Sequence, residues 1–253
     1  MYATERQQRI LDEARTAGRV EVAALAESLD VTTETIRRDL TALEKRGALR
    51  RVHGGAIPVE RLELEPTLAS RQSLRTEVKR RIAARVLEEI PAGGTVLLDA
   101  GSTTQAIVEL LPSDAELTVV TNSIPAAAAL AGRPRLNLLL LGGSVRGTTA
   151  AAVGDWTTQA LSDLVVDVAV LGTNGFSAAR GLTTPDQAEA NAKAAMVRAA
   201  RRVIVATDSS KAGDDHLHRF AMLEQVDLVV TDDDLADDVA DELRSEGTEV
   251  VCA

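Results

Sequence analysis

Small and hydroxylated residues occupy the run from Asp99 to Thr104 (DAGSTT), where an apolar segment ends and a helical pattern begins. Small residues at a strand-to-helix turn let backbone N–H groups and hydroxyls converge on an anion, and the dipole of the following helix adds to the attraction. Helix N-caps that bind nothing have the same composition. Alone, the run is therefore compatible with either a phosphate site or a simple cap.

Four other predicted strand ends carry polar or glycine-rich turns, at residues 121–123 (TNS), 142–146 (GGSVR), 172–175 (GTNG) and 208–211 (DSSK). Ligands of open α/β sheets bind beyond the carboxyl ends of the strands. Five such turns therefore predict one pocket, with Arg146 and Lys211 available to hold an anion. We expect its residues to include Asp99, Gly101, Ser102, Thr103, Thr104, Asn122, Ser123, Gly143, Arg146, Asn174 and Lys211.

A second group of residues with a clear chemical role lies between residues 33 and 53. Apolar positions 36, 40 and 43 predict an amphipathic helix that follows a short turn and another helix, as in a helix-turn-helix DNA reader. Arginine on such a helix can bind guanine O6 and N7 bidentately. We expect DNA contacts from Thr33, Thr35, Arg37, Arg38 and Thr41, and from Arg50, Arg51 and His53 in a following wing.

The net charge of −10 comes entirely from one part of the chain. Residues 1–60 contain ten Lys or Arg and ten Asp or Glu, whereas the remainder contains 18 basic and 28 acidic residues. Residues 37–53 hold six basic residues against two acidic ones. Such a local basic stripe is what contact with DNA phosphates requires. Only four residues are aromatic, which disfavours RNA binding by base stacking.

Other chemistry is sparse in this sequence. The three histidines form no metal-ligand cluster, and neither a P-loop nor a G-x-G-x-x-G motif follows a predicted strand, so we expect no metal and no cofactor. The single cysteine, Cys252, fits a reducing cytoplasm. No apolar run approaches the length of a membrane span.

Helical periodicity covers the first 47 residues. Helices are predicted over about residues 4–16, 22–29 and 33–46, the third after Thr32 as a favourable N-cap. Residues 48–52 and 56–59 flank the turn HGG, a pattern typical of a β-hairpin.

Seven short apolar runs then alternate with stretches long enough for helices, at residues 95–99, 117–121, 136–141, 166–172, 203–207, 228–231 and 249–251. The alternation predicts an α/β fold with a doubly wound, mostly parallel sheet and helices on both faces. We therefore divide the chain into a winged helix-turn-helix domain (1–59), a linker (60–76) and a ligand-sensing domain (77–253). The run Gly154–Trp156 is interpreted as packing.

Four stretches carry a resemblance to a known family: Arg6–Ile10 (RQQRI), Val20–Leu29, Thr35–Leu40 (TIRRDL) and Arg51–Ala56 (RVHGGA). They resemble the DNA-binding domain of the DeoR family of bacterial sugar-metabolism repressors, and the resemblance continues through the whole chain. It implies an effector domain similar in fold to ribose-5-phosphate isomerase, with the DAGSTT loop on the effector's phosphate and Lys211 at the far strand. It also matches Lys193 to a lysine common in the family, although a helix-surface charge explains Lys193 as well.

The resemblance implies a cytoplasmic repressor that binds double-stranded operator DNA as a homo-oligomer, a dimer or a tetramer, and is released by a sugar phosphate. The N-terminal stretch and residues 172–185 resemble actinobacterial fructose-operon repressors in particular, which favours fructose 1-phosphate. An activator or dual regulator of the same build stays open, as do the operator sequence and the oligomer size.

A residual sugar-phosphate isomerase is the alternative from a different class. Aldose–ketose isomerisation needs a carboxylate base near the substrate. The related isomerases carry acidic residues after a Gly-Ala turn, where this chain has Gly172–Phe176 (GTNGF). We therefore expect a binding protein and not an enzyme.

Overall fold

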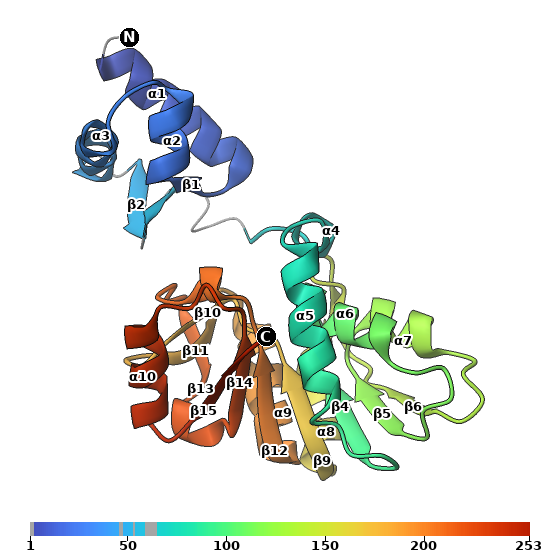
Figure 1. The fold of residues 1–253 in the computed structure, drawn as a ribbon. Helices are drawn as coiled ribbons and strands as arrows, with labels where there is room; N and C mark the ends of the chain where they lie inside the picture. The colour runs from blue at the N-terminus through green and yellow to red at the C-terminus, as the bar shows by residue number, and fades with distance from the viewer. Residues whose placement is uncertain (1–2, 46–47, 53, 59–64) are drawn as a thin grey trace. The chain divides into compact units, whose positions relative to one another are not determined.

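The structure is a computed structural model that describes residues 3–45, 48–52, 54–58 and 65–253. The chain forms two compact units, Met1–Glu65 and Pro66–Ala253 (Figure 1). Each unit has its own hydrophobic core, because the buried apolar residues of the N-terminal unit cluster only with one another.

Three helices and a small sheet form the N-terminal unit. They are α1 (Ala3–Ala17), β1 (Val20–Glu21), α2 (Val22–Ser28), α3 (Thr33–Lys45), β2 (Leu49–Val52) and β3 (Gly55–Pro58). Ile10, Leu25 and Leu40 are fully buried between the helices. The Thr32 hydroxyl accepts a hydrogen bond from the Thr35 N–H at 3.3 Å, so the N-cap predicted for the third helix is confirmed.

The predicted hairpin is also confirmed. β2 pairs with β3 in antiparallel register, and β1 pairs with the other edge of β3. Gly54 has a φ of 73°, and a Cβ on Gly55 would lie 2.0 Å from the carbonyl oxygen of Val20. The turn therefore requires glycine at both positions. His53, predicted to contact DNA, lies outside the described residues.

A seven-stranded sheet, parallel throughout, is the centre of the C-terminal unit. Its strands are β4 (Thr95–Leu98), β5 (Thr118–Thr121), β6 (Asn137–Leu140), β9 (Val166–Leu171), β12 (Ala200–Ala206), β14 (Leu228–Thr231) and β15 (Glu249–Cys252). All seven correspond to the predicted runs. Their order is β15-β14-β12-β9-β4-β5-β6, so the chain fills one side from β4 to β6 and the other from β9 to β15. The direction of winding thus reverses between β4 and β9.

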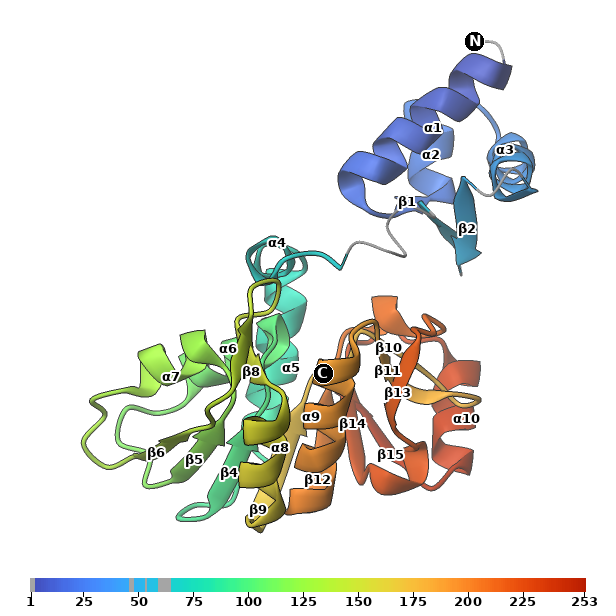
Figure 2. The ribbon, with the colours of Figure 1, turned by 180° about the vertical axis from the view of Figure 1, so that it is seen from behind.

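Helices cover both faces of this sheet (Figures 1 and 2). One layer contains α5 (Thr76–Leu87), α6 (Ser102–Leu110) and α7 (Ile124–Leu130), and the other contains α8 (Asp155–Ser162), α9 (Gln187–Ala199) and α10 (Asp237–Ser245). Successive strand residues face opposite layers. In β4, Val96 and Leu98 join the first core, and Leu97 joins the second. Burial on both faces explains why the strand sequences are continuously apolar.

Several short elements were not predicted. They are α4 (Leu68–Gln72) in the expected linker, the hairpin β7 (Ser144–Arg146) and β8 (Ala151–Val153), and an antiparallel sheet of β10 (Gly175–Ser177), β11 (Gly181–Thr184) and β13 (His218–Ala221). The interpretation of Trp156 as a packing residue is wrong, because it is 79% exposed at the start of α8.

Candidate functional site

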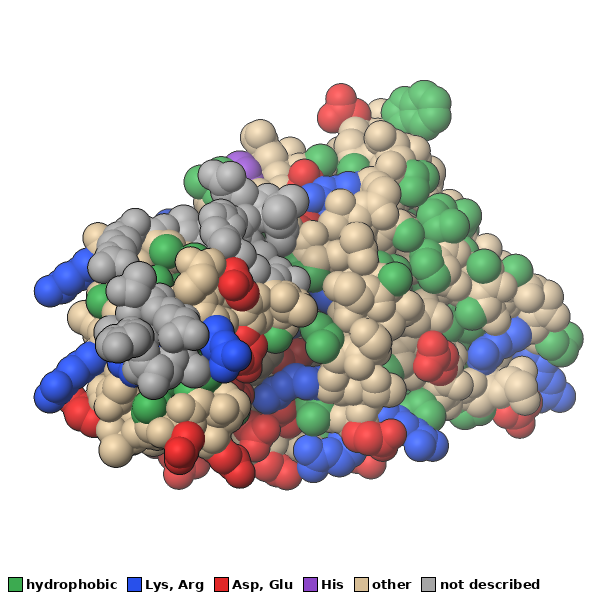
Figure 3. Space-filling model, turned by 90° about the horizontal axis from the view of Figure 1, so that it is seen from above, with side chains coloured by type: hydrophobic (Ala, Val, Ile, Leu, Met, Phe, Trp, Pro, Cys, Tyr) green, Lys and Arg blue, Asp and Glu red, His purple; other side chains and the backbone are tan. Residues whose placement is uncertain are grey.

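The N-terminal unit exposes the side of α3 that was predicted to contact DNA. Ile36 and Leu40 are fully buried, which leaves Thr33, Arg37 and Arg38 exposed and Thr35 and Thr41 half-buried. The Arg37 and Arg38 side chains are 55% and 81% exposed, and each forms a long ion pair with the Glu34 carboxylate, with N···O distances of 3.8 Å and 3.9 Å. Exposed ion pairs of this kind contribute about 0–1 kcal/mol, so DNA could displace them at little cost. Figure 3 shows basic side chains projecting from this unit.

The wing lies directly beside α3. The Arg51 N–H donates to Glu44 Oε1 at 3.0 Å, and the Arg51 guanidinium donates to the Thr41 hydroxyl at 3.4 Å. Arg51 is exposed and Arg50 half-buried. These contacts place Arg51 of the wing and Thr41 of α3 on one surface.

A buried ion pair that was not predicted fixes α3 against α1. Asp39 is 4% exposed, and its carboxylate accepts from Arg6 Nε at 2.5 Å and from Gln7 Nε2 at 2.9 Å. Removing one partner of such a pair is costly, because the other charge stays buried. Asp39 and Arg6 therefore set the orientation of the helix that presents Arg38.

In the C-terminal unit, a pocket of about 340 Å³, part of it open to solvent, lies beyond the carboxyl ends of β4 and β9. This is where the winding reverses, the usual ligand position in open α/β sheets. Its lining residues are Arg71, Ala100, Gly101, Ser102, Thr103, Thr104, Thr149, Gly172, Thr173, Asn174, Glu189, Lys193 and Lys211.

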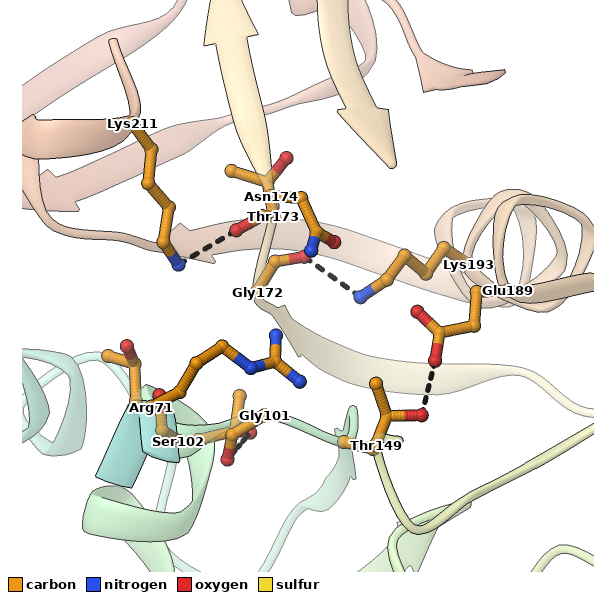
Figure 4. A pocket seen from close by; sticks show the side chains of 13 residues that line it. Arg71, Gly101, Ser102, Thr149, Gly172, Thr173, Asn174, Glu189, Lys193 and Lys211 are labelled. Atoms are coloured by element: carbon orange, nitrogen blue, oxygen red, sulfur yellow. Dashed lines mark hydrogen bonds between the residues drawn. The ribbon is translucent and has the colours of Figure 1, made fainter. Parts of the chain in front are cut away.

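One side of the pocket can receive an anion. α6 begins immediately after Gly101, and no side chain caps its first N–H groups. Arg71, from α4, and Lys211, from the single-turn helix Ser209–Lys211, both extend toward this side (Figure 4). Lys211 Nζ donates to the Thr173 carbonyl at 2.8 Å. Burial lowers the pKa of Lys211, although Asp208 acts in the opposite sense. A bound phosphate would favour the charged ammonium.

Lys193 forms a buried network beneath the pocket. Its ammonium hydrogen-bonds to the Asp99 carboxylate, donates to the Gly172 carbonyl at 3.0 Å and lies 5.4 Å from the centre of the Phe220 ring. Asp99 also accepts from the Gly172 N–H at 3.1 Å. The network joins the ends of β4 and β9 to α9. The Asp99 carboxylate balances the charge of Lys193. We therefore infer that this lysine stabilises the shape of the pocket.

Glu189 lines the pocket from the first turn of α9. It is 5% exposed, and its carboxylate accepts hydrogen bonds from the Thr149 hydroxyl and from the Arg146 guanidinium, the latter at 3.3 Å. Its own N–H is capped by Asp186 at 2.9 Å. Acidic residues were expected to be missing only from the turn Gly172–Phe176, and a carboxylate nevertheless lines the pocket. The GTNGF turn supplies none, but Glu189 reaches the pocket from another element.

Seven of the predicted pocket residues line the cavity together: Gly101, Ser102, Thr103, Thr104, Asn174, Lys193 and Lys211. Asp99 and Asn122 lie behind the lining and border a smaller adjoining cavity. Asn122 Oδ1 accepts from the Ala100 N–H at 3.0 Å, and Nδ2 donates to the Ala152 carbonyl at 3.1 Å. Asn122 therefore positions the pocket loop from behind.

Three predicted residues are not in the lining. Ser123 caps α7, accepting from the Ala126 N–H at 3.2 Å. Gly143 has a φ of 148°, and a Cβ there would lie 2.5 Å from the Val153 carbonyl, so close approach of the β8 backbone explains this glycine. Arg146 pairs with Asp186 at 3.2 Å and with Glu189. Its guanidinium contacts the pocket lining at Glu189, and its carbonyl accepts from the N–H of Thr149, another lining residue, at 3.3 Å.

Three lining residues lie outside the predicted turns and were missed: Arg71, Thr149 and Glu189. Ala100, Gly172 and Thr173 belong to the predicted turns but were not singled out. For Glu189 the sequence did contain a signal, since an acidic residue three positions after Asp186 is typical of a helix start, here directly beside a strand end. Arg71 had no comparable signal, because α4 brings it into place by tertiary packing. The buried Leu68 and a hydrogen bond from its N–H to the Thr148 carbonyl, at 2.8 Å, anchor α4.

Across residues 3–45, 48–52, 54–58 and 65–253, no group of three or more His, Cys, Asp or Glu side chains could hold a metal ion. The same search range contains no helix that combines the length and apolarity needed to cross a bilayer.

A winged helix-turn-helix unit joined to an α/β unit with a pocket lined by cationic and hydroxylated side chains is typical of DNA-binding proteins that respond to a small ligand. Comparison with known families agrees with this class. Residues 6–61 match the DeoR-like helix-turn-helix domain, and residues 74–233 match the DeoR C-terminal sensor domain. The chain belongs to the DeoR family of transcriptional regulators.

Similar proteins span nearly the whole chain. The HTH-type transcriptional regulator GlpR of Haloferax volcanii is 38% identical over 99% of this chain and 98% of its own length. The glycerol-3-phosphate regulon repressor of Escherichia coli is 31% identical over 92% of both. Among solved structures, ribose 5-phosphate isomerase A from Neisseria gonorrhoeae matches 55% of each chain at 19% identity and a TM-score of 0.41, too distant to support an argument.

Proposed function

We propose that this protein is a transcriptional repressor that releases its operator when a sugar phosphate fills the C-terminal pocket. The observation that carries the proposal is the meeting of Arg71, Lys211 and the uncapped start of α6 on one side of the pocket. Two cations and a helix N-terminus favour a phosphate more than any neutral ligand.

The relatives support the repressor role and a phosphorylated effector. The Escherichia coli relative is named for a glycerol-3-phosphate regulon, and a Bacillus subtilis relative, 33% identical over 92% of this chain, is named the transcriptional repressor GlcR. Fructose 1-phosphate is our candidate effector, and its support is the sequence resemblance to fructose-operon repressors. An activator or dual regulator would use the same two sites.

DNA binding is proposed to occur through α3 and the wing, with Arg37 and Arg38 reading base edges and Arg50 and Arg51 contacting phosphates. A homo-oligomer, dimer or tetramer, would let two α3 helices read the two halves of an operator. As a regulator of transcription, the protein is proposed to act in the cytoplasm.

The test is a gel-shift titration of the full-length protein on the DNA upstream of its own operon. We expect fructose 1-phosphate to weaken the complex about tenfold or more, the ordinary range of allosteric coupling, and fructose to have no effect. If glucose 6-phosphate or glycerol 3-phosphate acts in its place, the effector class stands and the identity changes. If no sugar phosphate changes DNA binding, the proposed response is wrong. A transcription assay with the same DNA then separates repression from activation.

Isomerase activity is a second candidate because of one observation, the Glu189 carboxylate in the pocket. An aldose–ketose isomerase uses a carboxylate as its base. Against it, similar proteins across the chain are named transcriptional regulators. We therefore keep the regulator as the proposed function and test turnover directly.

A further inference from the structure

The part of the chain that forms the β6 end of the main sheet is almost free of charge. Residues 117–145 contain only two charged side chains, Arg133 and Arg135, whereas 26% of the whole chain is charged. Arg135 pairs with Glu116 at 2.7 Å, and the Arg133 guanidinium donates to the Leu111 carbonyl at 2.8 Å. Both arginines precede β6 and are bound within the chain, so the strand itself and the helix beside it carry no charge.

Apolar side chains are exposed in the same region. In β6, Leu139 and Leu140 are 42% and 49% exposed, although successive strand residues point to opposite faces of the sheet. The neighbouring helix α7 packs on β6 (Figures 1 and 2) and exposes Ile124, Ala128 and Ala129. We call these five residues the β6 surface. Exposed apolar groups that gather without charges mark a surface that contacts another molecule.

β6 is also an unprotected edge of the sheet. In the part of the chain that the structure describes, β5 is its one partner strand, in regular register from Asn137 to Leu140. The N–H groups of Asn137 and Leu141 donate toward β5, so those of Leu138 and Leu140 point outward. Edge strands of soluble proteins usually carry charges, prolines or bulges that prevent pairing with a further strand. β6 has none of these, and its outer edge can therefore accept another strand.

A second copy of this chain is the occupant that fits this edge. Two β6 strands related by a twofold axis would pair in antiparallel orientation and join the two sheets into one. With the axis at Leu139, Leu138 lies opposite the partner's Leu140. The same register places Arg135 opposite the partner's Gly143. Apolar residues therefore meet apolar residues, and no charge meets a like charge.

The surroundings of the two sheet edges favour the same occupant. Because α7 packs on β6, the pairing would bring two α7 helices side by side on one face of the joined sheet, where side chains as small as Ala128 let helices approach closely. The opposite edge, β15, carries the exposed Glu249 and packs against the acidic helix α10. Two copies of β15 would bring like charges together, which destabilises a strand pair.

We propose that the β6 surface is where two copies of this protein associate, through antiparallel pairing of their β6 strands and contact between their α7 helices. The inference rests on the proposed function only for the expectation of a homo-oligomer, and it does not depend on the ligand in the pocket.

The test is the mass of the full-length protein in solution, measured by sedimentation equilibrium over a range of concentrations. Leu139→Lys places two ammonium groups opposite each other at the axis and should weaken association about tenfold or more. Leu140→Pro removes an outward N–H that β5 does not use, a change that an edge strand tolerates. It should also weaken association about tenfold or more, because each copy loses a hydrogen bond.

Two controls separate a lost contact from a lost fold. Leu217→Lys, the same substitution at a leucine that is 76% exposed outside the β6 surface, should associate like the wild type. A mixture of Leu139→Lys and Leu139→Glu should recover the association that each variant alone loses, because opposite charges then meet across the axis. A variant that had merely lost its fold would not recover in this way.

The outcomes also separate this inference from the proposed function. If the wild type stays monomeric at every concentration, or if Leu139→Lys and Leu140→Pro both keep the wild-type mass, the β6 surface is not the contact between copies. Gel shifts on the same samples record the response to a sugar phosphate. If association depends on β6 while no sugar phosphate changes DNA binding, the proposed response is wrong and the role of the β6 surface stands.

Discussion

Replacing Lys211 by methionine should weaken binding of a sugar phosphate about 30-fold. The substitution keeps the length of the side chain and removes the ammonium that extends toward the start of α6. One charge-assisted hydrogen bond contributes about 2 kcal/mol, and each 1.4 kcal/mol corresponds to a factor of ten. Arg71 remains in the variant, so binding should be reduced and not abolished.

The pH dependence gives an independent check on the same residue. Burial lowers the pKa of Lys211, so the free protein loses this ammonium at a lower pH than an exposed lysine would. A bound phosphate favours the protonated form. Wild-type affinity should therefore fall as the pH rises through the lowered pKa of Lys211, accompanied by proton uptake on binding, and Lys211→Met should lose that part of the pH dependence.

Calorimetry with fructose 1-phosphate and fructose, repeated in buffers of different ionisation enthalpy, measures both the affinity and the proton uptake. Lys45→Met, the same substitution at an exposed position of the N-terminal unit, is the matched control and should bind the effector like the wild type. If Lys211→Met binds within about threefold of the wild type, or if fructose binds as well as its phosphate, the assignment of the phosphate to this side of the pocket is refuted.

Four further predictions follow from the same structure. Arg38→Ala should cost about 1–3 kcal/mol of operator binding and relax base specificity. Arg51→Ala should instead weaken binding to all DNA sequences alike and lower by about one the slope of log affinity against log salt concentration. Salt-dependent gel shifts that give the two variants the same profile would contradict this division. Thr103→Asp, which puts a carboxylate at the pocket's anion side, should abolish the effector response and leave operator binding intact, and a retained response would place the phosphate elsewhere. Burial lowers the pKa of Lys79 from 10.5 to about 8, so the unfolded chain binds more protons than the folded one between these pH values. The free energy of unfolding should therefore rise with pH across that range by about 1 kcal/mol or more. Urea titrations at pH 7.5 and 9.5 should show a smaller rise in Lys79→Met than in the wild type. The full-length protein should not isomerise ribose 5-phosphate or glucose 6-phosphate, and turnover that disappears in Glu189→Gln would identify an enzyme.

The fold was readable from the sequence where periodicity is strong. The seven buried strands appear as apolar runs because helices cover both faces of the sheet, and Thr32 and Gly18 mark the helix ends of the N-terminal unit. The strands β7, β8, β10, β11 and β13 escaped prediction because they lie outside the regular alternation of apolar runs and helical stretches that marks the seven strands of the main sheet. Their stability comes from packing, as shown by the complete burial of Phe176 in β10 and Leu182 in β11.

The pocket was readable in part for a related reason. Parallel strands place their carboxyl ends at one edge, so polar turns after β4, β9 and β12 could be expected to meet. Sequence could not show which turn residues face the cavity and which support it: Ser123 caps a helix and Asn122 holds a loop. It also could not show Arg71, since nothing in a five-residue helix indicates where tertiary contacts will place it.

The position of α4 along the chain limits how a ligand can influence DNA binding. Arg71 lies six residues after Glu65, the last residue of the N-terminal unit, and its carbonyl, like that of Leu74 at 2.5 Å, accepts from Lys79 Nζ. A ligand that contacts Arg71 therefore acts on the same short stretch of backbone that leads to the DNA-binding unit. A contact of about 2 kcal/mol can change an equilibrium by at most about 30-fold. Any larger change in DNA affinity on ligand binding requires a second ligand-dependent contact, such as one to Lys211 or to a partner subunit.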